Sequence, residues 1–168
     1  IDLGGTKIEG IVLESKEKPI EVIRHRVDTE EKKGYLQVID NIKSLVEYIE
    51  NKINHKFDKL GIGTPGTLDP ATGLLKNSNS QCLNGMPLKK DLSKTLDKTI
   101  LIQNDANCFA LAETLLGSVN DQYPNAKNVF GIIMGTGVGG GVIINGKTVY
   151  GSQGIGGEWG HTIAVSYT

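Results

Sequence analysis

The sequence predicts an α/β fold built on a mixed sheet, and two patterns of apolar residues carry this prediction. Residues 7–15 and 19–29 alternate apolar and polar side chains, which is the period of a half-buried strand. Residues 35–53 place apolar side chains at every third or fourth position, as an amphipathic helix does. Strands and helices are interspersed along the rest of the chain, which is typical of α/β proteins.

The first half of the chain is expected to contain an antiparallel pair, a helix and a buried strand. A short turn joins residues 7–15 to residues 19–29, so these two strands are expected to pair. The helix follows over 35–53. Residues 59–69 are typical of a short apolar strand that ends in a loop with Gly and Pro. Residues 74–88 are rich in Asn and lack a period, so an irregular segment is expected there.

The second half repeats the alternation of strand and helix. Residues 99–103 are expected to form an apolar strand. Residues 105–116 are expected to form a short helix, which Gly117 ends. Residues 128–135 and 138–146 predict two more strands joined by glycines. The second of these strands finishes in Asn-Gly, the strongest signal for a tight hairpin, before residues 147–151.

Composition excludes several classes of function. The 168 residues suffice for one ordinary domain, and the net charge of −1 provides no basic face for nucleic acid or a membrane surface. No apolar run approaches the roughly 20 residues of a membrane span. Cys82 and Cys108 have neither metal-binding nor redox spacing, so a cytoplasmic protein is expected. The 22 glycines are an excess, and they are clustered.

Both ends of the sequence have the pattern of interrupted elements. Ile1 has the character of a residue inside a strand, and residues 162–168 contain no helix or strand stop signal. We therefore expect residues 1–168 to form the N-terminal domain of a longer protein, with a crossover to a second domain beginning near 150–168.

The stretch Asp2-Leu3-Gly4-Gly5-Thr6-Lys7 has two interpretations. Its glycines either supply a positive φ in a plain hairpin or let backbone N–H groups approach a phosphate closely. The second interpretation also explains the other residues. Thr6 offers a hydroxyl, Lys7 a charge, and Asp2 a carboxylate suited to a magnesium ion that carries phosphates.

A second glycine cluster, at residues 135–141, contains a literal G-x-G-x-x-G motif. Glu158 even lies about the right distance downstream for a nicotinamide-dependent oxidoreductase. That motif must open a helix, however, whereas here a β-branched strand follows. A second phosphate-binding hairpin, with Gly135, Thr136 and Gly137 at its centre, is therefore favoured over the dinucleotide fold.

Two further clusters carry polar groups that suit catalysis or binding. Either Asn104 or Asp105 is expected to cap the helix that follows, and a carboxylate at such a junction is also well placed to accept a proton from a bound hydroxyl. Glu158 and His161 are spaced by three residues among glycines. They suit hydrogen bonds to a polyol, or a metal through the histidine.

Together these motifs resemble the ROK family of sugar kinases and sugar-responsive repressors. "DLGGTK", "GIGTPGTLD", "NDANCFALAE", "GTGVGGGVIINGK" and "GEWGH" occur in that family's order, over residues 1–161. The chain is similar to the N-terminal half of such a kinase, most of all to the manno(fructo)kinase and glucokinase branch. The resemblance implies an actin-like, ribonuclease-H-like α/β domain, followed by a second domain across the active site.

The resemblance also implies roles for individual residues. Asp105 falls on the catalytic base, which binds the sugar and takes the proton of the phosphorylated hydroxyl. Residues that bind the sugar or lie near it are implied at Gly66, Asn79, Asn104, Glu158 and His161. Residues that bind the phosphates of ATP are implied at Asp2, Gly4, Gly5, Thr6, Lys7, Gly135, Thr136 and Gly137. His161 also matches one ligand of a structural zinc, whose cysteine ligands would lie after Thr168, so zinc is left open.

The function that the resemblance implies is an ATP-dependent hexokinase. It would use Mg²⁺ and transfer the γ-phosphate of ATP to a hydroxyl of fructose, mannose or glucose, in preference to N-acetylglucosamine. The implied partners are the hexose and ATP, with a homodimer for the full-length protein and neither nucleic acid nor membrane. A sugar-responsive repressor without catalysis is the alternative, and Asp105 with two phosphate motifs favours the kinase.

Overall fold

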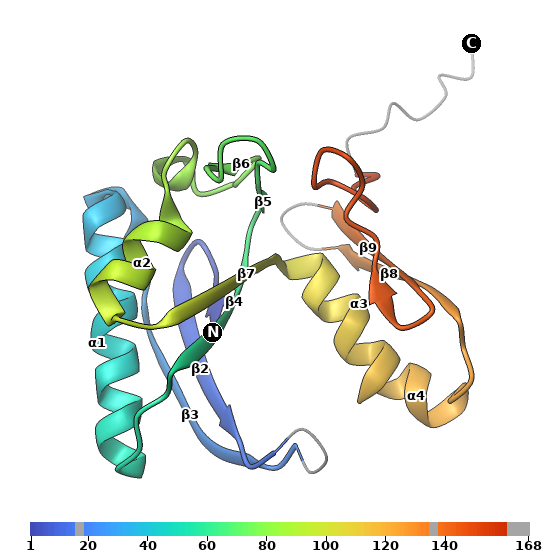
Figure 1. Cartoon of the computed structure of the whole chain (residues 1–168), viewed down its shortest axis with the longest axis horizontal. Helices are drawn as coiled ribbons and strands as arrows, with labels where there is room; N and C mark the ends of the chain where they lie inside the picture. The colour runs from blue at the N-terminus through green and yellow to red at the C-terminus, as the bar shows by residue number, and fades with distance from the viewer. Residues whose placement is uncertain (16–18, 135–137, 161–168) are drawn as a thin grey trace. The chain divides into compact units, whose positions relative to one another are not determined.

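The chain forms two compact units, Ile1–Gln103 (unit 1) and Asn104–Thr168 (unit 2). The computed structural model describes residues 1–15, 19–134 and 138–160. Each unit contains its own sheet and helices, as Figure 1 shows. No Gly-, Pro- or Ser-rich linker marks the boundary, which falls just before the last residue of a strand (Thr99–Asn104) that runs directly into a helix. The role of residues 1–168 as one domain of a longer protein stays a prediction.

Unit 1 is built on a five-stranded mixed sheet in the order β3-β2-β1-β4-β7. The strands β1 and β2 pair antiparallel, as do β2 and β3, whereas β1 and β4 run parallel. This confirms the predicted mixed sheet and the predicted antiparallel pair. The strands are β1 (Asp2–Leu3), β2 (Lys7–Leu13), β3 (Glu21–Asp28), β4 (Lys59–Thr64) and β7 (Thr99–Asn104).

Two helices cover one face of this sheet. The helix α1 (Tyr35–Ile53) has the predicted bounds, and its apolar stripe packs in one core with the inward side chains of the strands. The shorter helix α2 (Leu88–Leu96) lies beside α1 (Figure 1) and adds Leu88 and Leu92 to the same core. The Tyr35 hydroxyl donates to Asp91 Oδ2 over 2.8 Å and ties the two helices together. The sequence pattern did not predict α2.

Several very short elements connect the larger ones in unit 1. They are the 3₁₀ turns η1 (Glu31–Lys33) and η2 (Gln81–Leu83) and the two-residue strands β5 (Thr67–Leu68) and β6 (Leu75–Lys76). The strands β5 and β6 form a small antiparallel hairpin. Residues 74–88, expected to be irregular, therefore contain a strand and a turn of helix, each only two or three residues long.

Unit 2 contains an antiparallel sheet in the order β10-β9-β8 and two helices. Its elements are α3 (Asp105–Leu115), α4 (Ser118–Gln122), β8 (Asn128–Met134), β9 (Val138–Ile144) and β10 (Lys147–Thr148). The predicted Asn-Gly hairpin is confirmed, because Asn145 and Gly146 have φ angles of 50° and 72°. The helix α3 ends just before Gly117, as predicted, although Gly117 has a φ of −104° rather than a left-handed conformation and α4 follows it directly.

Glycines in the strands of unit 2 let α3 lie directly on the sheet. A Cβ at Gly131 would stand 2.7 Å from Ala110 Cβ, and a Cβ at Gly141 would stand 2.6 Å from the Ala106 carbonyl oxygen. Both distances are too short for a side chain, so helix and sheet meet backbone against backbone. Gly141, the last glycine of the second cluster, thus has a packing role that the motif alone did not reveal.

Candidate functional site

The glycines of the first motif do not have the backbone conformation that requires glycine. Gly4 and Gly5 are absent from the residues with a positive φ. A Cβ added at Gly5 would meet only ordinary contacts, at 3.5 Å from Ser80 Oγ and 3.7 Å from Glu31 Oε2. The missing side chain at Gly5 therefore leaves a small recess, about the size of one methyl group, and Gly5 itself is exposed. This observation favours the close approach of a ligand over the plain hairpin.

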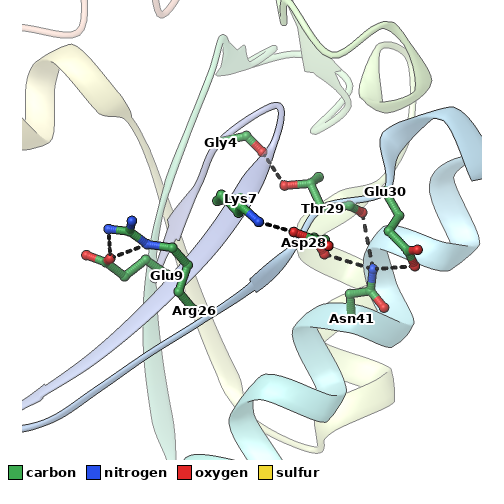
Figure 2. Close-up of polar contacts among 8 residues, drawn as sticks. All are labelled: Gly4, Lys7, Glu9, Arg26, Asp28, Thr29, Glu30 and Asn41. Atoms are coloured by element: carbon green, nitrogen blue, oxygen red, sulfur yellow. Dashed lines mark hydrogen bonds and ion pairs between the residues drawn. The ribbon is translucent and has the colours of Figure 1, made fainter.

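A buried threonine anchors this hairpin from below, as Figure 2 shows. The Thr29 hydroxyl donates to the Gly4 carbonyl over 2.6 Å, and the Thr29 amide donates to the Thr6 carbonyl over 2.9 Å. The Asn41 amide in turn donates to the carbonyls of Asp28 and Thr29 (Figure 2). Since Thr29 is only 1% exposed, the position of the hairpin is set by groups that no ligand touches.

Charged residues surround the hairpin. Lys7 forms an ion pair with Asp28 (Figure 2), and both side chains are largely exposed to solvent. Asp2 is exposed and lies directly opposite Glu9 in the β1–β2 register. A hydrogen bond from Arg26, with help from Arg24, outweighs desolvation and lowers the pKa of the Glu9 carboxyl. Glu9 is therefore neutralised by its own partners, while Asp2 stays open to a cation.

The predicted sugar residue Gly66 requires glycine on both conformational and steric grounds. Its φ is +78°, and a Cβ there would stand 2.3 Å from the Lys76 carbonyl oxygen and 2.8 Å from the Ser78 amide nitrogen. Gly66 thus lets the loop after β4 lie against residues 76–78. This contact places the predicted residues Gly66 and Asn79 in the same region of unit 1.

Asn79 is presented by a rigid segment. The Asn84 side chain accepts from the Ser78 amide and donates to the Ser78 carbonyl, both over 2.9 Å. The Ser78 hydroxyl accepts from the Ser80 amide over 3.1 Å. Ser78 and Ser80 are buried while Asn79 between them is exposed, so its side chain is held outward by groups that are themselves fixed.

In unit 2, Asn104 and Asp105 divide the roles that the sequence left open. Asn104 Oδ1 accepts from the Asn107 amide over 3.1 Å and so caps α3. Asn104 is 5% exposed, whereas Asp105 is exposed and accepts from the Ala106 amide over 2.7 Å. The helix cap thus rests on Asn104, and the accessible carboxylate at the start of α3 belongs to Asp105.

Glu158 is held against β9 by glycines on both segments. Gly157 has a φ of +91°, and a Cβ there would stand 2.8 Å from the Gly140 carbonyl oxygen. Trp159 packs edge-on against Phe130, with ring centroids 6.3 Å apart. The start of α3 also lies against β9, at Gly141. Residues 139–142 of β9 therefore position both Asp105 and Glu158.

Some predicted site residues cannot be placed. Gly135, Thr136, Gly137 and His161 lie outside the described residues, so the second phosphate motif and the histidine stay predictions. Within residues 1–15, 19–134 and 138–160, no group of three or more His, Cys, Asp or Glu residues is arranged to hold a metal ion. No helix in that part of the chain has the length and apolar character needed to cross a bilayer.

The structure thus brings the predicted residues together in two groups. In unit 1, a Cβ at Gly5 would stand 3.5 Å from Ser80 Oγ, so the first phosphate hairpin adjoins the segment that presents Asn79. In unit 2, the residues next to Asp105 and Glu158, namely Ala106 and Gly157, both lie against the glycines of β9. Sequence reasoning missed Thr29, Glu31 and Asn84, which hold or border these groups. All three are polar residues in connecting segments, where neither periodicity nor a motif distinguishes them.

Comparison with known proteins identifies the family. The model of the ROK family matches residues 1–167. An N-acetyl-D-glucosamine kinase of Mannheimia succiniciproducens is 42% identical over 160 residues, which cover 95% of this chain and 50% of that protein.

Solved structures agree. The ROK hexokinase of Thermus thermophilus superposes with a TM-score of 0.81 at 30% identity, over 98% of this chain and 52% of that one. A ROK family glucokinase of Streptomyces griseus, in complex with glucose and AMPPNP, gives a TM-score of 0.78 at 28% identity, over 98% of this chain and 49% of that one. The chain spans about half the length of the relatives it matches. It belongs to the ROK family.

Proposed function

We propose that the protein containing this chain is an ATP-dependent sugar kinase, which transfers the γ-phosphate of ATP to a hydroxyl of a free hexose. The observation that carries this proposal is the hairpin at Gly4 and Gly5. Neither glycine has a positive φ; the backbone of Gly4 is fixed by hydrogen bonds to Lys7 and Thr29, while Gly5 and Thr6 beside it are exposed. A fixed and exposed hairpin of this kind suits an anionic ligand that must be held in line for transfer.

The resemblance to the family supplies the proposed roles of the individual residues. The backbone N–H groups of Gly5 and Thr6 would bind phosphate oxygens, and Asp2 would hold Mg²⁺, for which one carboxylate together with substrate phosphates is a usual set of ligands. The magnesium ion would neutralise charge on the phosphates during transfer. Asp105 would accept the proton of the sugar hydroxyl as that oxygen bonds to the γ-phosphorus and ADP leaves. Asn79 and Glu158 would orient the sugar through its other hydroxyls.

The identity of the sugar is the finer part of the proposal. The resemblance in the motifs favoured fructose, mannose or glucose over N-acetylglucosamine. The relatives from Mannheimia succiniciproducens and Histophilus somni, however, both carry the name N-acetyl-D-glucosamine kinase, at 42% and 41% identity. We therefore place N-acetyl-D-glucosamine first among the candidate acceptors, with glucose, mannose and fructose as competitors.

A coupled assay of ADP release by the full-length protein tests this. We expect release that depends on both ATP and sugar, with the highest kcat/KM for N-acetyl-D-glucosamine; a higher value for glucose, mannose or fructose would overturn that ranking but not the kinase. Sugar binding without turnover would support the sugar-responsive repressor instead. ADP release at the same rate with and without sugar would exclude the proposed reaction.

A further inference from the structure

Glu31 has a carboxylate oxygen that is buried and has no hydrogen-bond partner. Among the residues that the structure describes, Glu31 Oε2 is one of three such side-chain atoms. Its neighbour Glu30 differs, because it pairs with Lys33 and accepts from Asn41. An acceptor buried without a donor destabilises the fold, and such groups in native proteins call for an explanation.

The position of Glu31 suggests why this oxygen has no partner within the protein. Glu31 Oε2 stands 3.7 Å from the place where a Cβ of Gly5 would be, and Ser80 Oγ stands 3.5 Å from the same place. The recess above Gly5 is thus bordered by a carboxylate and a hydroxyl. Ser80 follows Asn79 directly, so the recess adjoins the segment assigned to the sugar. We call the space bordered by Gly5, Glu31 and Ser80 the Gly5 recess.

The pKa of Cys82 also indicates that the Glu31 carboxylate lies close to Ser80 and its neighbours. Burial, and after it the negative charge of Glu31, raise the pKa of the Cys82 thiol. Cys82 belongs to the turn η2 that follows Ser80. The carboxylate of Glu31 therefore lies close to residues 80–82.

The backbone around Glu31 fixes this position. Glu30 has φ 54° and ψ 36°, a left-handed conformation that is uncommon for a residue with a side chain. The chain turns there directly after Thr29, the residue that anchors the hairpin, and enters η1 with Glu31 as its first residue. The same turn therefore sets both the hairpin and the carboxylate beside it.

We propose that Glu31 is a further sugar-binding residue, which accepts a hydrogen bond from one hydroxyl of the acceptor hexose in the Gly5 recess. A carboxylate has no donor, so it repels a bare phosphate and needs an O–H or N–H group opposite it. The Gly5 amide stays available to a phosphate, since a backbone N–H and a Cβ leave the chain in different directions. Glu31 would thus stand where the acceptor and the transferred group meet. This inference rests on the proposed sugar kinase activity.

The experiment compares the full-length protein with its Glu31→Gln variant. We expect the KM for the sugar to rise about 10-fold, because the amide oxygen of Gln can still accept but lacks the charge that strengthens the bond, with the KM for ATP within about twofold of the original. The thermal midpoint of unfolding should stay equal or rise, because the replaced charge has no partner to lose. A purely structural role would lower that midpoint instead.

Deoxy sugars and two further variants test the proposed contact more specifically. Deoxy sugars that lack one hydroxyl each should identify the contact, because the difference in KM between the original protein and the Glu31→Gln variant should vanish for one analogue alone. Glu30→Gln is the matched control, and its sugar KM should not change. Gly5→Ala fills the recess without a clash, so it should weaken sugar binding in calorimetry while the protein stays folded.

The possible outcomes separate this inference from the function on which it rests. If the original protein phosphorylates a hexose and Glu31→Gln leaves the sugar KM unchanged, Glu31 is not a ligand and the inference alone falls. A change confined to the ATP or Mg²⁺ dependence would also overturn it, since the donor would then be a metal-bound water. If the original protein neither binds nor phosphorylates any hexose, both proposals are overturned.

Discussion

The substitution Glu50→Gln should strongly destabilise unit 1, because it breaks a buried ionic network. Glu50 is 3% exposed, and its carboxylate pairs with Lys98 over 2.7 Å and with Lys56 over 3.0 Å. It also accepts from the Phe57 amide over 2.9 Å, while Lys98 donates to the Phe57 carbonyl. The network therefore joins the end of α1, the loop after it and the start of β7.

The magnitude follows from the pKa of Glu50. Desolvation acts to raise that pKa, but the hydrogen bonds from Lys98, Phe57 and Lys56 outweigh it and lower the pKa from 4.5 to about 2. At about 1.4 kcal/mol per pH unit, this difference corresponds to at most about 3 kcal/mol of unfolding free energy at pH 7. Breaking a buried ion pair typically costs about 3–5 kcal/mol, which agrees in order of magnitude.

The sign of the pH dependence is fixed by the direction of the shift. The folded protein holds its proton less tightly than the unfolded chain, so the stabilisation is complete above about pH 5 and is lost as the pH falls toward 2. Less than half of it, about 1.4 kcal/mol, should remain at pH 3.

Urea unfolding at pH 7, 5 and 3 measures this directly. We expect Glu50→Gln to lower the unfolding free energy by about 2–3 kcal/mol at pH 7 and by much less at pH 3. Glu47→Gln is the control on the same helix, because Glu47 is exposed and lies 3.9 Å from Lys43. Its effect should stay below about 0.5 kcal/mol. An equal loss for Glu50→Gln at pH 7 and pH 3 would show that packing, and not charge, is responsible.

Three substitutions test the site itself. Asp105→Asn should lower kcat by on the order of 10²–10⁴ while sugar binding and the Asn104 cap persist, and a variant with most of its kcat would leave Asp105 without a catalytic role. Gly141→Ala should destabilise unit 2 by about 1–3 kcal/mol in urea, since the new Cβ would meet the Ala106 carbonyl at 2.6 Å, whereas Gly61→Ala, in open space, should not. Thr29→Val removes the hydroxyl that anchors Gly4 and should raise the KM for ATP about 2- to 10-fold; an unchanged KM would mean that the hairpin needs no anchor.

The elements that sequence predicted well are those with a long, regular burial pattern. The helix α1 has its predicted bounds because eight of its residues are buried in one stripe. By contrast, α2 buries only Leu88 and Leu92, and α4 has no buried residue at all. A helix that buries two residues or none leaves too weak a hydrophobic period to detect, which is why both helices were missed.

In the candidate site too, some residues could be predicted from the sequence and others could not. Motifs indicated Asp2, Gly4 and Asp105, because acids and glycines at strand ends suggest chemistry. They could not decide why Gly5 is glycine, since a positive φ and an open recess look the same in a sequence. Nor could they reveal Thr29 and Glu31, whose importance comes from burial against a hairpin some 25 residues away in the chain.

The most direct test of the proposed function is to follow the phosphates by ³¹P NMR. The full-length protein would be incubated with Mg²⁺-ATP and N-acetyl-D-glucosamine, and then with glucose, mannose and fructose in turn. We expect the γ-phosphate signal to disappear and a sugar phosphomonoester to appear in equal amount, with one ADP for each, and Asp105→Asn to suppress both changes. Release of orthophosphate without a sugar ester, or no loss of ATP with any of the four sugars, would contradict the proposed kinase.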